Sequence, residues 1–221
     1  FMAYNFLGLH HIKTSGKQLY KELKDYELES KLETQTEECF QGVKQFFREG
    51  NSDFRLPSHF PYTIESASIN RYYKNDQGLF KAMFRRSEAE IVRKGNIEVV
   101  KDRLGLNCIL KRKEAKGNIV PIDSQIMASA QLQGELLRMR KAFWVNNPQT
   151  YRSYHISLDC CLGKPGILYE VEVEYVGRHI DSETNEGEII KDITELTGIL
   201  IEKFPELRPS RLTKQDWLGI K

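Results

Sequence analysis

The chain has 221 residues, 40% of them hydrophobic, and this length suits one globular domain with a sizeable core. Its 33 lysines and arginines nearly balance its 31 aspartates and glutamates, so the net charge of +2 gives no general attraction to DNA, RNA or membrane surfaces. The apolar runs are shorter than the roughly 20 residues of a membrane-spanning helix. We therefore expect no membrane partner and no DNA partner, and any anion binding must come from local arrangement.

The cysteines and histidines do not suggest a metal site of their own. Cys39, Cys108, Cys160 and Cys161 lack paired ligand spacing, and the scattered histidines predict surface positions rather than zinc ligands. Reduced thiols are typical of cytoplasmic or nuclear proteins. The start of the sequence lacks the charged and apolar regions of a signal peptide, so we expect an intracellular location.

The first predicted elements are a strand and a helix. Residues 1–24 are expected to form a peripheral lead-in. Residues 26–33 alternate, with Ser30 the only polar residue on the apolar face, which predicts a strand. Thr34 or Thr36 can cap a helix that ends at Gly50.

The remaining chain is rich in short strand patterns. Strands are predicted at 66–73, 79–86, 97–106, 107–114, 138–145, 151–161 and 168–177, and helices at 124–137 and 188–204, followed by a C-terminal tail at 205–221. Strands outnumber helices and no strand–helix–strand alternation is present. The pattern predicts an α+β fold, an antiparallel sheet or barrel with helices packed outside, as a single domain over residues 1–221.

Two rows of carboxylates are the first candidate for chemistry. Alternation places Glu170, Glu172 and Glu174 on one face of a strand, with neighbours about 6.5 to 7 Å apart. Like charges in a row repel, so they need open water or compensating cations. Glu27 and Glu29 form a second row, and in a closed sheet both rows could face one interior and hold Mg²⁺ or Mn²⁺.

Basic residues on other predicted strands complement these rows. They are Arg71, Lys81, Arg85, Lys101, Arg103, Lys111, Lys113, Arg138 and Arg140. Several are two positions apart and share a face. Since guanidinium and ammonium groups bind phosphate oxygens, the two sets together predict a tunnel for a metal–polyphosphate complex. The alternative for any one strand is the solvated face of a β-sandwich, which we favour for a strand taken alone but not for the full set.

Several short segments resemble the triphosphate tunnel metalloenzymes, also called CYTH-like proteins. The segment 27–31, Glu-Leu-Glu-Ser-Lys, resembles their ExExK signature, and 168–175 is similar to the last acidic strand of the metal-dependent RNA 5′-triphosphatases that begin mRNA capping. The segments 138–143 and 154–159 resemble the basic strand of those enzymes and the strand after it. Thr213-Lys214 is similar to a Ser-Lys near the end of other CYTH proteins.

The resemblance implies a closed antiparallel β-barrel of about eight strands with helices packed outside. It also implies specific roles for named residues. The implied metal ligands are Glu27, Glu29, Glu170, Glu172 and Glu174, with Mg²⁺ or Mn²⁺ as the cofactor. The implied phosphate-binding residues are Lys31, Arg85, Lys111, Lys113, Arg138, Arg140 and Lys214. The implied catalytic residues are Glu172, Glu174 and Asp159. Ser157 stands where the capping enzymes have an acidic residue, so either Ser157 or Asp159 is the functional group of its strand.

The implied function is an RNA 5′-triphosphatase that removes the γ-phosphate as the first step of mRNA capping, with a capping guanylyltransferase as a partner. One alternative is a small-molecule enzyme of the same fold, namely an inorganic tripolyphosphatase, a nucleoside or thiamine triphosphatase, or an adenylate cyclase. Another is a non-catalytic module that binds polyphosphate or a phosphorylated ligand, although two rows of carboxylates disfavour a site for anions alone.

Overall fold

The structure is a computed structural model that describes residues 23, 26–58, 62–85, 87–178 and 185–220. The predicted lead-in therefore lies outside the described residues, apart from the buried Leu23. The strands are β1 (Tyr26–Thr34), β2 (Ile64–Asn75), β3 (Gly78–Arg85), β4 (Glu88–Val99), β5 (Ile109–Pro121), β6 (Gln131–Asn147), β7 (Arg152–Gly163), β8 (Gly166–Arg178) and β9 (Arg208–Pro209). The helices are α1 (Cys39–Arg48), α2 (Gln125–Ala128), α3 (Glu186–Lys203) and α4 (Lys214–Trp217).

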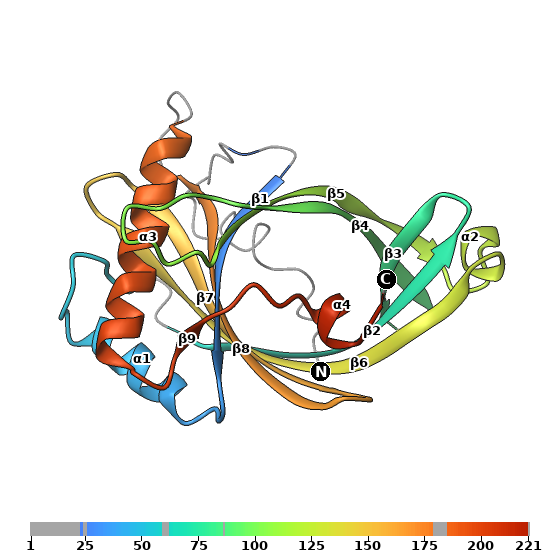
Figure 1. Ribbon diagram of the computed structural model, residues 1–221, viewed down its shortest axis with the longest axis horizontal. Helices are drawn as coiled ribbons and strands as arrows, with labels where there is room; N and C mark the ends of the chain where they lie inside the picture. The colour runs from blue at the N-terminus through green and yellow to red at the C-terminus, as the bar shows by residue number, and fades with distance from the viewer. Residues whose placement is uncertain (1–22, 24–25, 59–61, 86, 179–184, 221) are drawn as a thin grey trace.

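Eight of the strands form a closed antiparallel barrel. Their order is β5-β4-β3-β2-β6-β7-β8-β1, and β1 pairs back with β5, which closes the ring seen in Figure 1. Closure leaves these eight strands without a free sheet edge. The predicted α+β barrel of about eight strands is confirmed.

Helices α1 and α3 cover one side of the barrel from outside (Figure 1). Helix α3 buries the apolar stripe Ile189, Ile193, Leu196 and Leu200 against the outward side chains of the strands. Aromatic rings from α1 complete this core, with the ring centroid of Phe40 5.5 Å from that of Phe143 on β6. The main apolar core therefore lies between the barrel wall and the helices, and not inside the barrel.

Several predicted boundaries are wrong. Helix α1 begins at Cys39 after Glu38, so neither Thr34 nor Thr36 is its N-cap. The helix expected at 124–137 is only the short α2, because β6 begins at Gln131 and pairs with β2 from Lys74 onward. Pairing with a neighbouring strand here overrides the partial apolar stripe that suggested a helix. The strand expected at 97–106 ends at Val99, so Lys101 and Arg103 lie in the connection between β4 and β5.

Among the described residues, no helix is both long and apolar enough to cross a membrane. All four cysteines are free thiols.

Candidate functional site

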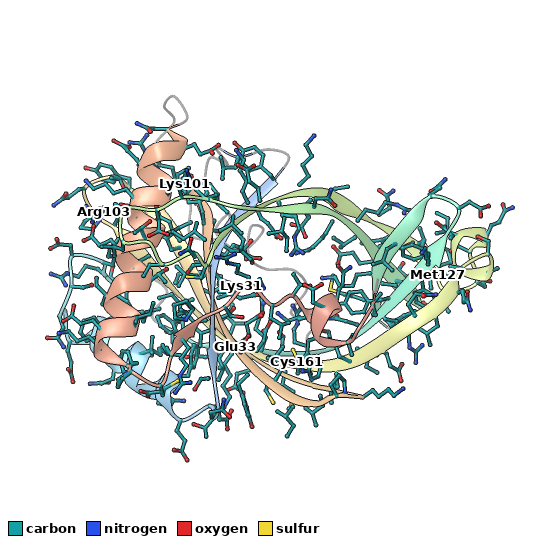
Figure 2. The ribbon with its side chains drawn as sticks, in the orientation of Figure 1. Lys31, Glu33, Lys101, Arg103, Met127 and Cys161 are labelled. Carbon is teal, nitrogen blue, oxygen red and sulfur yellow. The ribbon has the colours of Figure 1, made fainter. Side chains whose placement is uncertain are left out.

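The two predicted rows of carboxylates lie side by side on the inner face of the barrel. Strands β1 and β8 are paired, with Glu29 opposite Glu174 and Lys31 opposite Glu172. The alternate residues of both strands pack outward into the main core, so alternation turns every charged side chain inward. Lys31, labelled in Figure 2, marks this inner face.

Lys31 is almost completely buried among carboxylates. Its Nζ lies 2.7 Å from Glu172 Oε1 and 3.0 Å from Glu170 Oε1, and its side chain is only 3% exposed. Burial alone would lower the pKa of Lys31, but the charges of Glu170 and Glu172 outweigh burial and raise it above its ordinary value. Lys31 is therefore ionised and already lies where it could contact a phosphate.

A second set of ion pairs surrounds Asp159. Arg140 donates two hydrogen bonds to this carboxylate, from Nε at 2.6 Å and from Nη2 at 2.8 Å, and also contacts Glu172. Lys214 of α4 lies 2.9 Å from Asp159 Oδ2 and 3.0 Å from Glu172 Oε1, and it also contacts Glu170. Burial would raise the pKa of Asp159, but Arg140 and Lys214 hold it below its ordinary range.

Asp159, Glu170 and Glu172 form a buried acidic triad that could hold a metal ion. One oxygen from each residue lies within 4.8 Å of the other two. Glu170 Oε2 is buried and has no hydrogen-bond partner among the described residues. Carboxylate oxygens are the ligands that Mg²⁺ and Mn²⁺ prefer, so the donor set and the unpaired oxygen fit a hard divalent cation.

A second acidic group continues along the inner face. Glu27 is paired with Lys94 at 2.8 Å and with Arg112 at 2.9 Å, and these two cations lower its pKa to about 2 against the effect of burial. Burial, together with the charges of Glu27 and Glu29, raises the pKa of Glu174 to about 8. The carboxyls of Glu29 and Glu174 thus share a region where negative charge is not fully compensated.

Lys81 and Arg138 form a basic region elsewhere on the inner face. Lys81 lies opposite Tyr72 of β2, and burial and the charges of Lys94 and Arg138 all lower its pKa well below the ordinary value. Arg138 Nε is buried without a hydrogen-bond partner among the described residues. Such groups suit an anion, since a bound phosphate would satisfy both the charge and the free N–H.

Some predicted phosphate-binding residues do not face the interior. Lys111 and Lys113 lie on the outer face of β5, where Lys111 Nζ is 2.9 Å from Glu186 Oε1 and Lys113 is exposed. The prediction that these two lysines line the tunnel is wrong, because the intervening Arg112 is the residue that turns inward to Glu27. The side chain of Arg85 lies outside the described set.

Three other basic residues of the predicted tunnel also lie outside it. Arg71 is directed outward and pairs with Glu135 at 2.9 Å. Lys101 and Arg103 lie near α3 in Figure 2, with Arg103 Nη2 3.7 Å from Glu195 Oε2.

Ser157 and Asp159 both face the interior, two positions apart on β7. Ser157 lies opposite Glu172 and Asp159 opposite Glu170. Asp159 takes part in the ion pairs, whereas the buried Ser157 hydroxyl has no hydrogen-bond partner among the described residues. His155 is also on this face, 4.9 Å from the ring of Trp144, and burial lowers its pKa to about 3. The expectation of a surface histidine is wrong at this position.

Arg112 and Lys94 are inward-facing residues that sequence reasoning missed. Residues 111–113 are all basic, so alternation alone cannot say which of them turns inward. Lys94 lies beside an irregularity in the pairing of β4 with β5, where a period of two fails.

Among known proteins, the chain matches solved structures only. No family model matches the chain, and no curated protein matches it. Among solved structures, S. pombe Pct1 RNA triphosphatase in complex with the Spt5 CTD matches with a TM-score of 0.42 and 14% identity, over 88% of this chain and 82% of that chain. A structure of S. pombe Pct1 RNA triphosphatase alone matches with a TM-score of 0.41 and 14% identity, over 90% and 83% of the two chains.

Proposed function

We propose that the chain is a metal-dependent triphosphate hydrolase, and that its substrate is the 5′-triphosphate end of RNA. The observation that carries the proposal is the inner face of the barrel, where buried carboxylates alternate with buried lysines and arginines. Moving a charge from water into a protein interior costs several kcal/mol, and paired charges recover only part of it. A binding site for a metal and a polyanion accounts for such an interior, because both ligands need these charges.

The metal would be held by carboxylates of the two acidic rows. The proposed ligands are Glu27, Glu29 and one or more of Glu170, Glu172 and Glu174. Glu29 and Glu174 support the assignment most directly, because their carboxyl pKa values are raised in the absence of a cation. Bound Mg²⁺ or Mn²⁺ would neutralise phosphate oxygens and so favour attack at the γ-phosphorus.

The phosphates would be held by cations of the inner face. Lys31, Arg138, Arg140 and Lys214 are the sequence-predicted residues that face inward, and Lys81, Lys94 and Arg112 are further candidates. Several of these cations are paired with carboxylates. Substrate binding would therefore exchange carboxylate partners for phosphate oxygens, while Arg85 stays a proposed phosphate ligand from the sequence.

Hydrolysis needs a water molecule placed in line with the bond that breaks. Burial would raise the pKa of Glu172, but Lys214, Lys31 and Arg140 hold it well below the ordinary value, so the carboxylate is ionised and can orient a water. The water oxygen bonds to the γ-phosphorus as the bond from the γ-phosphorus to the β–γ bridging oxygen breaks. A proton of the water passes to a phosphate oxygen, giving inorganic phosphate and a diphosphate end. Glu174 and Asp159 are the other proposed catalytic groups, Asp159 by fixing Arg140.

RNA is the favoured substrate because the acidic and basic strands resemble those of the capping triphosphatases. In that role the chain would act before a capping guanylyltransferase, in the nucleus or the cytoplasm. Thr213-Lys214 is the feature that also suits a small-molecule enzyme, since Lys214 reaches the triad as part of a C-terminal segment.

The test is phosphate release from triphosphate-ended RNA, ATP and inorganic tripolyphosphate, each with Mg²⁺, with Mn²⁺ and with neither. We expect metal-dependent release that is fastest from RNA and falls about 100-fold or more in Glu172→Gln. Glu135→Gln is the matched control, because Glu135 is on the outer face with its side chain 56% exposed. Equal rates on all three substrates would contradict the RNA assignment, and no release from any would indicate a binding module.

A further inference from the structure

His155 and Trp144 form an aromatic pair on two neighbouring strands of the barrel. They lie opposite each other in the pairing of β7 with β6, and their ring centroids are 4.9 Å apart. Trp144 is only 6% exposed, whereas His155 is half-buried. The indole therefore packs against the imidazole, and part of the imidazole stays accessible to a ligand.

Alternation places this pair on the inner face and not in the main core. On β6 the residues on either side of the tryptophan, Phe143 and Val145, pack outward into that core. Ile156, the neighbour of the histidine on β7, does the same. Both rings therefore belong to the interior that also holds the acidic rows.

The pair lies at a defined distance from the acidic triad along the barrel. His155 precedes Asp159 by four residues on β7, which is about 13 Å along a strand. Glu174, opposite His155, follows Glu170 by the same number of residues on β8. A substrate whose terminal phosphate lies beside the triad has two further phosphates and a sugar to place along this length, which brings its base to the level of His155.

On the other side of the triad the inner face is apolar and covered. Leu136 and Leu168 form a cluster there with Trp217 and Leu218. Leu136 is 1% exposed and Leu168 is 7% exposed. The part of a substrate beyond its phosphates therefore extends in the opposite direction, toward the aromatic pair.

The aromatic pair offers a contact that its charged neighbours do not. The side chains of Arg140 and Lys94, on the same inner face, are 17% and 19% exposed and suit phosphate oxygens. The flat face of an aromatic ring suits a base, because proteins hold single-stranded RNA largely by stacking bases on aromatic side chains, histidine included. The interior thus has charged groups at the level of the phosphates and an aromatic ring at the level of the base.

We propose that His155, supported by Trp144, is a stacking platform for the base of the first nucleotide and makes the site prefer a nucleoside-bearing triphosphate to inorganic tripolyphosphate. The inference rests on the proposed function and names the side chain that recognises RNA beyond its phosphates. Stacking uses the face of the ring, so the platform requires no change of protonation and no covalent step.

The experiment compares two substrates in the presence of Mn²⁺, triphosphate-ended RNA and inorganic tripolyphosphate, which has no base. In His155→Ala we expect the KM for RNA to rise about tenfold, equivalent to about 1.4 kcal/mol, and kcat to stay within about twofold. Both constants for tripolyphosphate should stay within about twofold, because this substrate ends before the ring. Titration calorimetry with adenosine 5′-(β,γ-imido)triphosphate, a nucleotide that resists hydrolysis, should show binding that weakens about tenfold.

Two further variants separate stacking from packing. His155→Phe keeps an aromatic face and should keep the KM for RNA within about threefold, whereas His155→Leu lacks a flat ring and should raise it as His155→Ala does. The matched control is Tyr73→Ala on the outer face, where the half-buried Tyr73 stacks on the buried Phe80 with ring centroids 5.7 Å apart. This control disrupts an equivalent ring pair and should leave the KM for both substrates unchanged.

The outcomes separate the platform from the triphosphatase assignment. If His155→Ala does not fold, the comparison of His155→Phe with His155→Leu decides. An unchanged KM for RNA, or an equal rise for both substrates, would overturn the platform and leave the triphosphatase assignment in place. No phosphate release from either substrate would overturn the triphosphatase assignment, and the calorimetric comparison of the variants would still decide on the platform.

Discussion

The inner and outer faces of β8 are made of alternating residues from one strand, and both faces are largely buried. Outward, Val171 and Val173 are 0% exposed in the main core under α3. Inward, Glu170 and Glu172 are 0% and 5% exposed and contact Lys31. The two sides of this strand are thus buried to a similar degree, the outer side with apolar residues and the inner side with charged residues.

The energetic consequences of the two kinds of burial also differ. Removing an apolar side chain from water stabilises the fold by about 1.5 to 3 kcal/mol. A buried ion pair, by comparison, is often no better than an apolar pair of the same volume. We infer that apolar packing on the outer face stabilises the barrel. This stabilisation offsets the cost of burying charged groups on the inner face, where they can bind a ligand. Substitutions on the two faces should therefore separate stability from activity.

The largest expected effect is on stability, from Phe143→Ala on the outer face of β6. Phe143 is 0% exposed, and its ring centroid lies 5.5 Å from Phe40 and 6.2 Å from Phe47. Loss of this ring leaves a cavity, and we expect the free energy of unfolding to fall by about 3 to 5 kcal/mol. Denaturant unfolding measures the change. A loss below about 1 kcal/mol would show that this core does not hold the barrel together.

The second effect is on activity, from Arg140→Met on the inner face of the same strand. Arg140 holds Asp159 through two hydrogen bonds and contacts Glu172, so its loss removes a proposed phosphate ligand and loosens both carboxylates. We expect phosphate release to fall about 100- to 1000-fold, equivalent to about 3 to 4 kcal/mol. Lys141→Met, one residue along and directed outward to Glu37, should stay within about twofold. Equal losses of phosphate release in Arg140→Met and Lys141→Met would contradict a functional difference between the two faces of β6.

The sequence predicted the faces of β1 and β8 because their charged and apolar residues alternate strictly. Val171 and Val173 can only be the core side, which leaves Glu170 and Glu172 for the interior. The strand count and the absence of strand–helix–strand units indicated an antiparallel sheet or barrel. The resemblance of short segments to the triphosphate tunnel enzymes added the expected residue roles.

Other features of the site depend on pairing that one sequence does not reveal. Three successive basic residues at 111–113 give no indication of which one turns inward. The segment 212–220 is short, and its apolar residues show no clear period. Its place in the barrel follows from contacts with Leu136 and Leu168, which are distant in sequence. Contacts between residues that are distant in sequence likewise direct Arg112 inward to Glu27 and place Lys214 beside Asp159.

A smaller effect should distinguish the neighbours Arg112 and Lys111. Arg112→Met removes two hydrogen bonds to Glu27, which keeps Lys94 as a partner, so we expect phosphate release to fall about tenfold, or about 1.4 kcal/mol. Lys111→Met removes only a partly exposed pair with Glu186 and should change release less than about twofold. The reverse ranking would place Lys111, as the sequence suggested, at the site.

The smallest effect is a pH dependence of the metal-free protein, measured as the free energy of unfolding with a chelator present. Burial raises the pKa of Glu170 to about 7, and burial with the charges of Glu27 and Glu29 raises the pKa of Glu174 to about 8. Both values exceed the ordinary carboxyl pKa, so the folded protein binds these protons more tightly than the unfolded chain. The resulting stability is fully present below about pH 4.5 and is lost as the pH rises through 7 and 8.

We therefore expect these carboxyls to lower the free energy of unfolding by about 1 kcal/mol between pH 7 and 9, a fraction of the full shift because Glu174 is partly exposed. Lys81 acts in the opposite direction, because its lowered pKa makes stability rise with pH. His155, with a folded pKa of about 3, titrates below this window. Cys108, with a folded pKa of about 11, affects stability above it. Glu174→Gln should flatten the slope because it removes one of the two titrating carboxyls. Equal slopes in the unaltered protein and in Glu174→Gln would contradict the raised pKa of Glu174, because the contribution of Lys81 is common to both proteins.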